Sequence, residues 1–310
     1  MKNKVLLAGF ILTVVLLQNL GAQHPEEMPD NSFFKAIRAN QNESYITFSQ
    51  GFGNLEPLVF EAAIEPYFLI RTSKDARWGA TLSPAIKLRM YAEESLPVRT
   101  PSYNPYLSFY HQLVFTRKET PYIVYVFLTL AHHSNGQEGD FYLEDEKINT
   151  KTGNFSTNYF ELGVFFNRQL LPFANTTEYL KTSLEIHPGL DMNDELKGRY
   201  GSYRWHNRLK IYRLSWRKLR KQYDEEQRYA TKIPVVSAAF EASWIFGERS
   251  GAKATDISER LSFSAKLAYK PPKVRDISFF VKIYTGEDYY NIYFTRRISV
   301  LQFGLQAFAF

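Results

Sequence analysis

Residues 121–136 read PYIVYVFLTLAHHSNG and divide into two sets of alternate residues that differ in character. Successive side chains of a β-strand point to opposite faces, so a period of two indicates a strand whose two faces differ. One face is aliphatic for most of its length and then ends in an imidazole and a hydroxyl: Tyr122, Val124, Val126, Leu128, Leu130, His132 and Ser134. We therefore predict a strand with one face turned toward an apolar phase.

Eleven further segments resemble this one, and most are close to the about 9–11 residues that a tilted membrane strand needs. The chain has 21 Tyr and 25 Phe, and their alternation with polar residues is typical of a barrel with an apolar outside and a wet lumen. An even strand count lets the first and last strands pair, which removes exposed edges. We predict an all-β, twelve-stranded antiparallel transmembrane β-barrel with strands at 44–54, 57–71, 79–92, 105–116, 121–134, 156–167, 178–190, 203–217, 232–246, 260–270, 276–286 and 295–309.

The first 22 residues have the composition of a secretory signal. Lys2 and Lys4 precede the apolar run Val5–Leu17, and Gly21 and Ala22 offer a cleavage site. We expect a signal peptide at 1–22, an N-terminal periplasmic segment at 23–43 and the barrel domain at 44–310. The terminal Phe310 resembles the assembly signal of bacterial outer-membrane barrels. A secreted, soluble β-sandwich is the alternative.

Composition excludes several kinds of site. The chain has no cysteine, which excludes disulfides, thiolate metal sites and a cysteine nucleophile. Removing Lys2 and Lys4 lowers the formal net charge only from +6 to +4. The basic run Arg217–Lys221 is followed by the acids Asp224–Glu226 and has no aromatic platform around it. We therefore expect no nucleic-acid partner.

Strand order brings three polar residues to one rim. If the chain starts in the periplasm, the fifth strand ends outside the cell with His132 and Ser134, and the sixth begins there with Asn158. In their strands, all three residues occupy the same alternate positions as the aliphatic side chains that we expect to face lipid. An ester hydrolase needs a nucleophile, a base and a group that orients the base. Ser134, His132 and Asn158 have those chemical properties, with Ser134 and His132 about 6.5 Å apart along the strand.

A His-x-Ser pair on a strand also arises by chance. In that alternative the three residues are only polar residues at the membrane interface, without a catalytic role. The neighbouring His133 has the opposite parity, so we expect it among polar groups of the lumen. We expect the scattered His111, His187 and His206 to be lumen or rim residues as well.

The segment His132–Gly136, with Asn158 starting the next strand, resembles the His-x-Ser-Asn-Gly active-site pattern of the outer membrane phospholipase A family. Glu94–Arg99, followed by Tyr103 and Pro105, is similar to that family's loop between its third and fourth strands. Tyr284–Arg296 is similar to its last hairpin. The resemblance thus extends over most of the chain after residue 43.

This resemblance implies a calcium-dependent homodimer that hydrolyses acyl esters of membrane phospholipids in a Gram-negative outer membrane. It implies Ser134 as nucleophile, His132 as base, Asn158 as orienter and the Gly136 N–H as an oxyanion donor. Calcium would be held by the Gln137 main-chain oxygen, by Asn154 where the family has serine, with Ser156 nearby, and by a carbonyl of Ser95 from the partner subunit.

The chain departs from the family pattern at several positions. His133 stands in place of an acidic residue, Gln137 in place of an arginine, and Asn154 in place of a serine. The loop at 137–157 is longer than usual and carries Asp140, Glu144, Asp145 and Glu146, which we take as solvated charge rather than calcium ligands. The connection at 216–231 is also long and charged.

A calcium-dependent phospholipase is the function that these patterns favour. The rival hypotheses are a non-catalytic outer-membrane pore or scaffold barrel, and a barrel acyltransferase that passes the acyl group to another lipid. Neither acyl-position nor head-group preference follows from the sequence.

Overall fold

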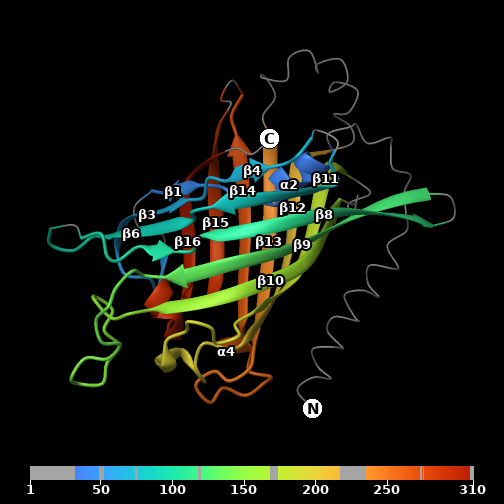
Figure 1. Ribbon diagram of the computed structural model, residues 1–310. Coiled ribbons are helices and arrows are strands. Elements are labelled where there is room, and N and C mark those ends of the chain that lie inside the picture. Colours follow the sequence, from blue (N-terminus) through green and yellow to red (C-terminus); the bar gives the residue numbers. More distant parts are fainter. Residues whose placement is uncertain are drawn as a thin grey trace.

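Twelve antiparallel strands close into a barrel in the computed structural model, which describes residues 32–48, 52–73, 76–95, 97–117, 120–167, 174–216, 235–272, 274 and 276–307 (Figure 1). Each strand pairs with its neighbours in the chain, and the last strand returns to pair with the first. Eight strands are continuous: β9 (Thr120–Ser134), β10 (Ser156–Asn167), β11 (Ala174–Ile186), β12 (Tyr203–Trp216), β13 (Val235–Phe246), β14 (Leu261–Lys270), β15 (Ile277–Glu287) and β16 (Arg297–Ala307).

The other four barrel strands are each assigned as two pieces. They are β1 (Tyr45–Thr47) with β2 (Phe52–Gly53), β3 (Leu58–Ile64) with β4 (Phe68–Ile70), β5 (Trp78–Ser83) with β6 (Ile86–Tyr91), and β7 (Ser102–Tyr103) with β8 (Tyr106–Arg117). Pro66, Pro84 and Pro105 lie at three of the four breaks. Proline has no N–H to donate, so it interrupts the hydrogen-bond ladder while the strand direction continues.

The predicted fold class and strand count are confirmed, and one strand position is wrong. We predicted the seventh strand at 178–190, but β11 starts and ends four residues earlier, at Ala174–Ile186. After β11 the chain turns away at Pro188 and Gly189, and Gly189 has a φ of +80°. The predicted signal peptide, most of the 216–231 connection and Phe310 lie outside the described residues.

The two faces of the barrel wall differ as the alternation predicted. On β9, Leu128 and Leu130 are 39% and 40% exposed on the outside, while Tyr125 and Phe127 are buried on the lumen side. The same holds on β10, where Leu162 is 59% exposed and Phe165 is buried. The outside of the wall is therefore apolar and available to lipid.

Two aromatic clusters occupy the ends of the lumen, and ion pairs lie between them. One cluster, at the rim where β9 ends and β10 begins, includes Phe155, Tyr200 and Phe294. Between the ends, Arg89 bonds Glu61 at 2.7 Å and Asp288 at 2.9 Å, with all three side chains fully buried. Buried charges persist where opposite charges and hydrogen bonds compensate their desolvation.

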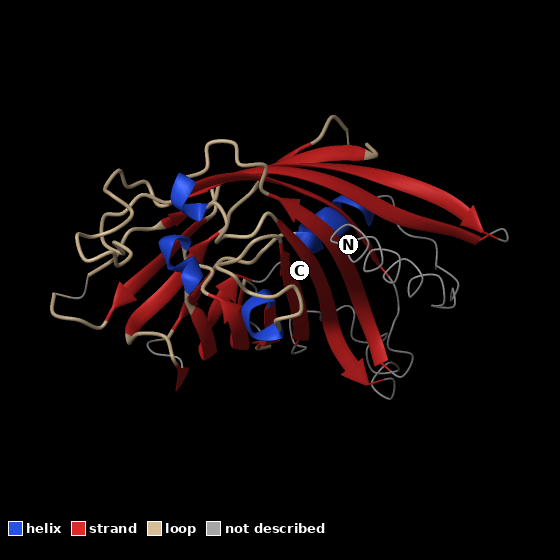
Figure 2. Ribbon diagram, turned by 90° about the horizontal axis from the view of Figure 1, so that it is seen from below, coloured by secondary structure: helices blue, strands red, loops and turns tan. Residues whose placement is uncertain are grey.

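The other aromatic cluster surrounds a helix, α2 (Ser32–Asn40), that lies inside the ring of strands (Figures 1 and 2). The alternation pattern did not predict this helix; we expected residues 23–43 to be an N-terminal periplasmic segment, whereas α2 packs against the inner wall of the barrel. Short helical turns also occur in the rim loops: η1 (Asp194–Leu196), α4 (Ile257–Arg260) and η4 (Asn291–Thr295). Within the described ranges, no helix has the length and apolar character needed to span a membrane.

Candidate functional site

The pairing of β9 with β10 brings the predicted trio together. In this register Asn158 lies opposite His132, and Ser156 lies opposite Ser134. Residues paired across two antiparallel strands project from the same face. That face continues into the exposed Leu128, Leu130, Phe160 and Leu162, so the three side chains lie at the edge of the lipid-facing surface.

His132 and Asn158 are joined by a hydrogen bond of 2.7 Å between Nδ1 and Oδ1. The Asn158 Nδ2 donates to the Leu190 carbonyl at 3.2 Å, and this contact orients the amide with its oxygen toward the ring. Since Oδ1 can only accept, Nδ1 of His132 must carry the proton. The other ring nitrogen, Nε2, is then the one able to accept a proton.

Ser134 lies two residues beyond His132 on the same face. Its backbone neighbours across the sheet are Ser156 on β10 and Tyr103 on β7. Among the hydrogen bonds of the described residues, none joins the Ser134 hydroxyl to the His132 ring. The structure therefore brings His132 and Asn158 into contact and places Ser134 beside them.

Asn135 holds the turn that follows Ser134. Its side chain is buried, donates to the Gly153 carbonyl at 2.8 Å, and accepts from the N–H groups of Phe155 at 3.0 Å and Gln137 at 3.3 Å. Gly136 then adopts a φ of +65°, and a Cβ there would lie 3.4 Å from the Tyr103 ring. Asn135 belongs to the His132–Gly136 motif, but its structural role was not predicted, because the backbone groups that it bonds become its neighbours only in the folded loop.

The oxygen donors predicted for calcium are distributed over one long loop and one distant turn. The loop closes on itself through a bridge between Gly139 and Gly153, which brings Gln137 and Asn154 to its two ends. Ser156 donates to the Asp191 carbonyl at 3.4 Å. Ser95 lies in the turn after β6, with a φ of +66°.

These residues fit a hard cation by chemistry. Main-chain, amide and hydroxyl oxygens are ligands that Ca²⁺ accepts. The side chains of Gln137 and Asn154 are half-buried, and neither enters a hydrogen bond among the described residues. Over all the residues that the structure describes, no group of three or more His, Asp or Glu is arranged as a metal site.

Behind the trio, on the lumen side, a second histidine network supports β10. Thr157, between Ser156 and Asn158, hydrogen-bonds His187 Nδ1 at 3.0 Å, and His187 Nε2 contacts Glu185 at 2.7 Å. Burial lowers the pKa of His187 below its usual value, despite the nearby Glu185. His133 points into the lumen as expected and meets Ser102 at 2.8 Å.

Comparison with known proteins supports the fold. No protein-family model matches the chain, and no curated protein matches it. A solved structure does: outer membrane phospholipase A from Escherichia coli at pH 6.1, with alanine replacing an active-site asparagine. The TM-score is 0.54 and the sequence identity 14%, over 91% of this chain and 100% of that one. At this identity the likeness establishes an outer-membrane type of β-barrel fold for the chain.

Proposed function

We propose that this chain is a calcium-dependent phospholipase of a Gram-negative outer membrane, active as a homodimer. The observation that carries the proposal is the His132–Asn158 hydrogen bond on the lipid-facing surface, with Ser134 beside it. A base whose tautomer is set by a neighbouring amide, next to a hydroxyl, is the arrangement that acyl transfer requires.

The reaction would proceed through an acyl-enzyme. Ser134 Oγ attacks the carbonyl carbon of an acyl ester while His132 Nε2 takes the hydroxyl proton. The C–O bond to the glycerol then breaks, and His132 returns the proton to the leaving lysophospholipid. Water attacks the acyl-serine next, giving up a proton to His132, which passes it back to Ser134 Oγ as the fatty acid leaves.

Asn158 would keep the ring in position through both halves of this cycle. The amide stabilises the imidazolium less than an aspartate would, but it avoids placing an unpaired carboxylate beside lipid. Acyl chains would lie along the exposed apolar side chains of β9 and β10, since Leu130 and Phe160 adjoin the trio on the same face and Leu162 follows them.

Calcium would be held by Gln137, Asn154 and Ser156, together with Ser95 of the partner subunit. When bound, it would supply positive potential for the oxyanion that develops at the acyl carbonyl. The Gly136 N–H would add a donor there. Dependence on the partner's Ser95 is the reason we propose a homodimer.

The test compares two adjacent histidines that face opposite sides of the wall. Purified, refolded protein is given phosphatidylcholine in mixed micelles, with calcium or with a chelator, and the products are measured by mass spectrometry. We expect calcium-dependent release of fatty acid and lysophospholipid. Ser134→Ala and His132→Ala should each lower the rate about 10³-fold or more, whereas the matched control His133→Gln should remain active.

An inactive wild-type protein that is folded and supplied with calcium would favour the pore or scaffold hypothesis. Equal losses in the His132 and His133 variants would also contradict the proposed site. Recovery of the acyl chain on another lipid, instead of as free fatty acid, would identify an acyltransferase.

A further inference from the structure

Helix α2 fills the lumen at the end opposite the candidate active site. Its buried side chains Phe33, Phe34 and Ile37 are at most 7% exposed and pack on aromatic residues of the inner wall. Phe33 stacks on Tyr125 with ring centroids 5.7 Å apart. The aromatic residues that receive the helix come from five successive strands: Tyr110, Tyr125, Phe127, Phe165, Tyr179 and Tyr212.

The inner surface of β12 hydrogen-bonds the end of this helix. A helix leaves its last carbonyls without partners. Three consecutive lumen-facing side chains supply them: Tyr212 donates to Ala39 O at 3.1 Å, Arg208 to Asn40 O, and Lys210 to Gln41 O at 2.6 Å. Positive charge at a helix C-terminus is also favourable for the helix dipole.

An ion-pair latch follows the helix. Glu43 contacts Lys210 and Lys266, each at 2.9 Å, and its side chain is only 11% exposed. Burial disfavours the ionised carboxyl, but the two ammonium groups outweigh this effect and hold the pKa of Glu43 below its usual range. The N-terminal segment is thus tied to strands far away in the sequence.

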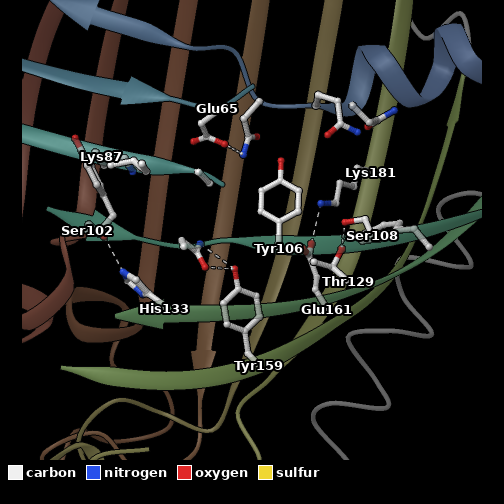
Figure 3. Close-up of a pocket in the computed structure, with 18 of the residues that line it drawn as sticks. Glu65, Lys87, Ser102, Tyr106, Ser108, Thr129, His133, Tyr159, Glu161 and Lys181 are labelled. Atoms are coloured by element: carbon white, nitrogen blue, oxygen red, sulfur yellow. Dashed lines mark hydrogen bonds and ion pairs between the residues drawn. The ribbon is translucent and has the colours of Figure 1, made fainter. Parts of the chain in front are cut away.

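The helix end and the opposite rim enclose a polar cavity of about 220 Å³ (Figure 3). Asn40, Gln41 and Asn42 line it from the helix side, while Ser102 and His133 line it toward the rim. Ser108 and Thr129 lie on its wall, joined by a hydrogen bond of 2.6 Å.

We propose that α2 is a lumen plug: it closes the barrel to ions and small solutes at this end, and the latch of Glu43 with Lys210 and Lys266 keeps it in place. This role goes beyond catalysis and does not depend on it. The inner wall is built to receive the helix, since both its apolar face and its terminal carbonyls find matched partners there.

The absence of cysteine makes the plug testable with a single introduced thiol. Ser108→Cys places it on the cavity wall, and Glu144→Cys provides an exposed reference on a rim loop. A small neutral thiol reagent is applied to the folded protein in detergent. We expect Ser108→Cys to react at least about a hundredfold more slowly than Glu144→Cys, because the helix blocks access.

Two substitutions should open the plug. Glu43→Gln removes the latch, and Ile37→Asp places a carboxylate against the aromatic residues. Each is combined with Ser108→Cys, and each should raise the labelling rate about tenfold or more. The control Glu56→Gln removes a carboxylate that pairs with Arg296 away from α2 and should leave the rate unchanged.

The readout is restricted to variants that keep the heat-dependent gel mobility of a folded barrel, so that unfolding is not mistaken for opening. Rapid labelling of Ser108→Cys without any plug substitution would overturn the proposal. Folded Glu43→Gln and Ile37→Asp variants that both stay as protected as the control would overturn it as well.

Discussion

The amide of Asn158 has two contacts with opposite chemical requirements. Its oxygen accepts from His132, and its nitrogen donates to the Leu190 carbonyl. The second contact sets the first, because a flipped amide would bring two acceptors together at Leu190. The loop after β11 therefore contributes to the orientation of the His132 ring through Asn158.

Replacing Asn158 tests whether this orientation matters. We expect Asn158→Ala to lower lipid hydrolysis about 10- to 100-fold, since nucleophile and base remain while the ring loses its acceptor. Asn158→Asp keeps an acceptor and should be more active than Asn158→Ala. Rates measured on mixed micelles with calcium decide this, and an Asn158→Ala variant as active as wild type would remove the residue from the mechanism.

Asn135 is a structural residue within the same motif. Its amide satisfies two backbone N–H groups and one carbonyl, so truncation leaves buried polar groups without partners. We expect Asn135→Ala to destabilise the turn at Gly136 by about 2–3 kcal/mol. Faster proteolysis of the loop at 137–156, with barrel mobility on gels unchanged, is the expected sign. A cleavage rate equal to that of wild type would contradict it.

Strand β10 depends on close contact with its neighbours. At Gly163 a Cβ would lie 2.5 Å from the Thr182 carbonyl oxygen and 2.7 Å from the Phe127 ring. Glycine is needed here because β11 and the lumen aromatic residue occupy the space that a side chain would take. This strand carries Asn158 at its other end, so its packing also bears on the candidate site.

We expect Gly163→Ala to destabilise the barrel by about 1–3 kcal/mol, as overpacking in a filled core does. Urea unfolding followed by tryptophan fluorescence measures the difference. Gly189→Ala is a comparison variant without crowding: no atom lies within 4 Å of a Cβ there, so any loss of stability comes from backbone strain at its φ of +80°. If Gly163→Ala loses no more stability than this control, crowding is not the reason for the glycine.

The lumen of the whole barrel is held together by paired charges, and Glu43 makes these pairs sensitive to pH. Because its folded pKa lies below the usual range, ionised Glu43 stabilises the fold between that range and neutral pH, where both lysine partners are charged. The contribution is lost only as the pH falls below about 4, where an unfolded glutamate already binds its proton.

We therefore expect the stability difference between wild type and Glu43→Gln, about 3 kcal/mol for a broken buried pair, to be constant from about pH 7 to 5 and to shrink below about pH 4. Urea midpoints measured across this range test the sign. A difference that grows on acidification would show that Glu43 is not the ionised partner of Lys210 and Lys266.

The periodicity of side chains along each segment was sufficient to predict most of the barrel strands and to predict that His132, Ser134 and Asn158 lie together. A period of two decides which side chains share a face, and antiparallel neighbours meet near their connecting loop. These two facts were enough to place His132, Ser134 and Asn158 together at one rim. They also predicted that His133 faces the lumen.

Only the tertiary structure revealed the contents of the lumen and the orientation of the Asn158 amide. The contacts that determine both join residues far apart in the sequence. Closing the barrel brings Glu43 to Lys266 and Phe33 to Tyr125, contacts that no local period can reveal. The amide of Asn158 is likewise oriented by a carbonyl 32 residues away. The sequence by itself determined a barrel with an apolar outside; only ring closure determined what fills its lumen.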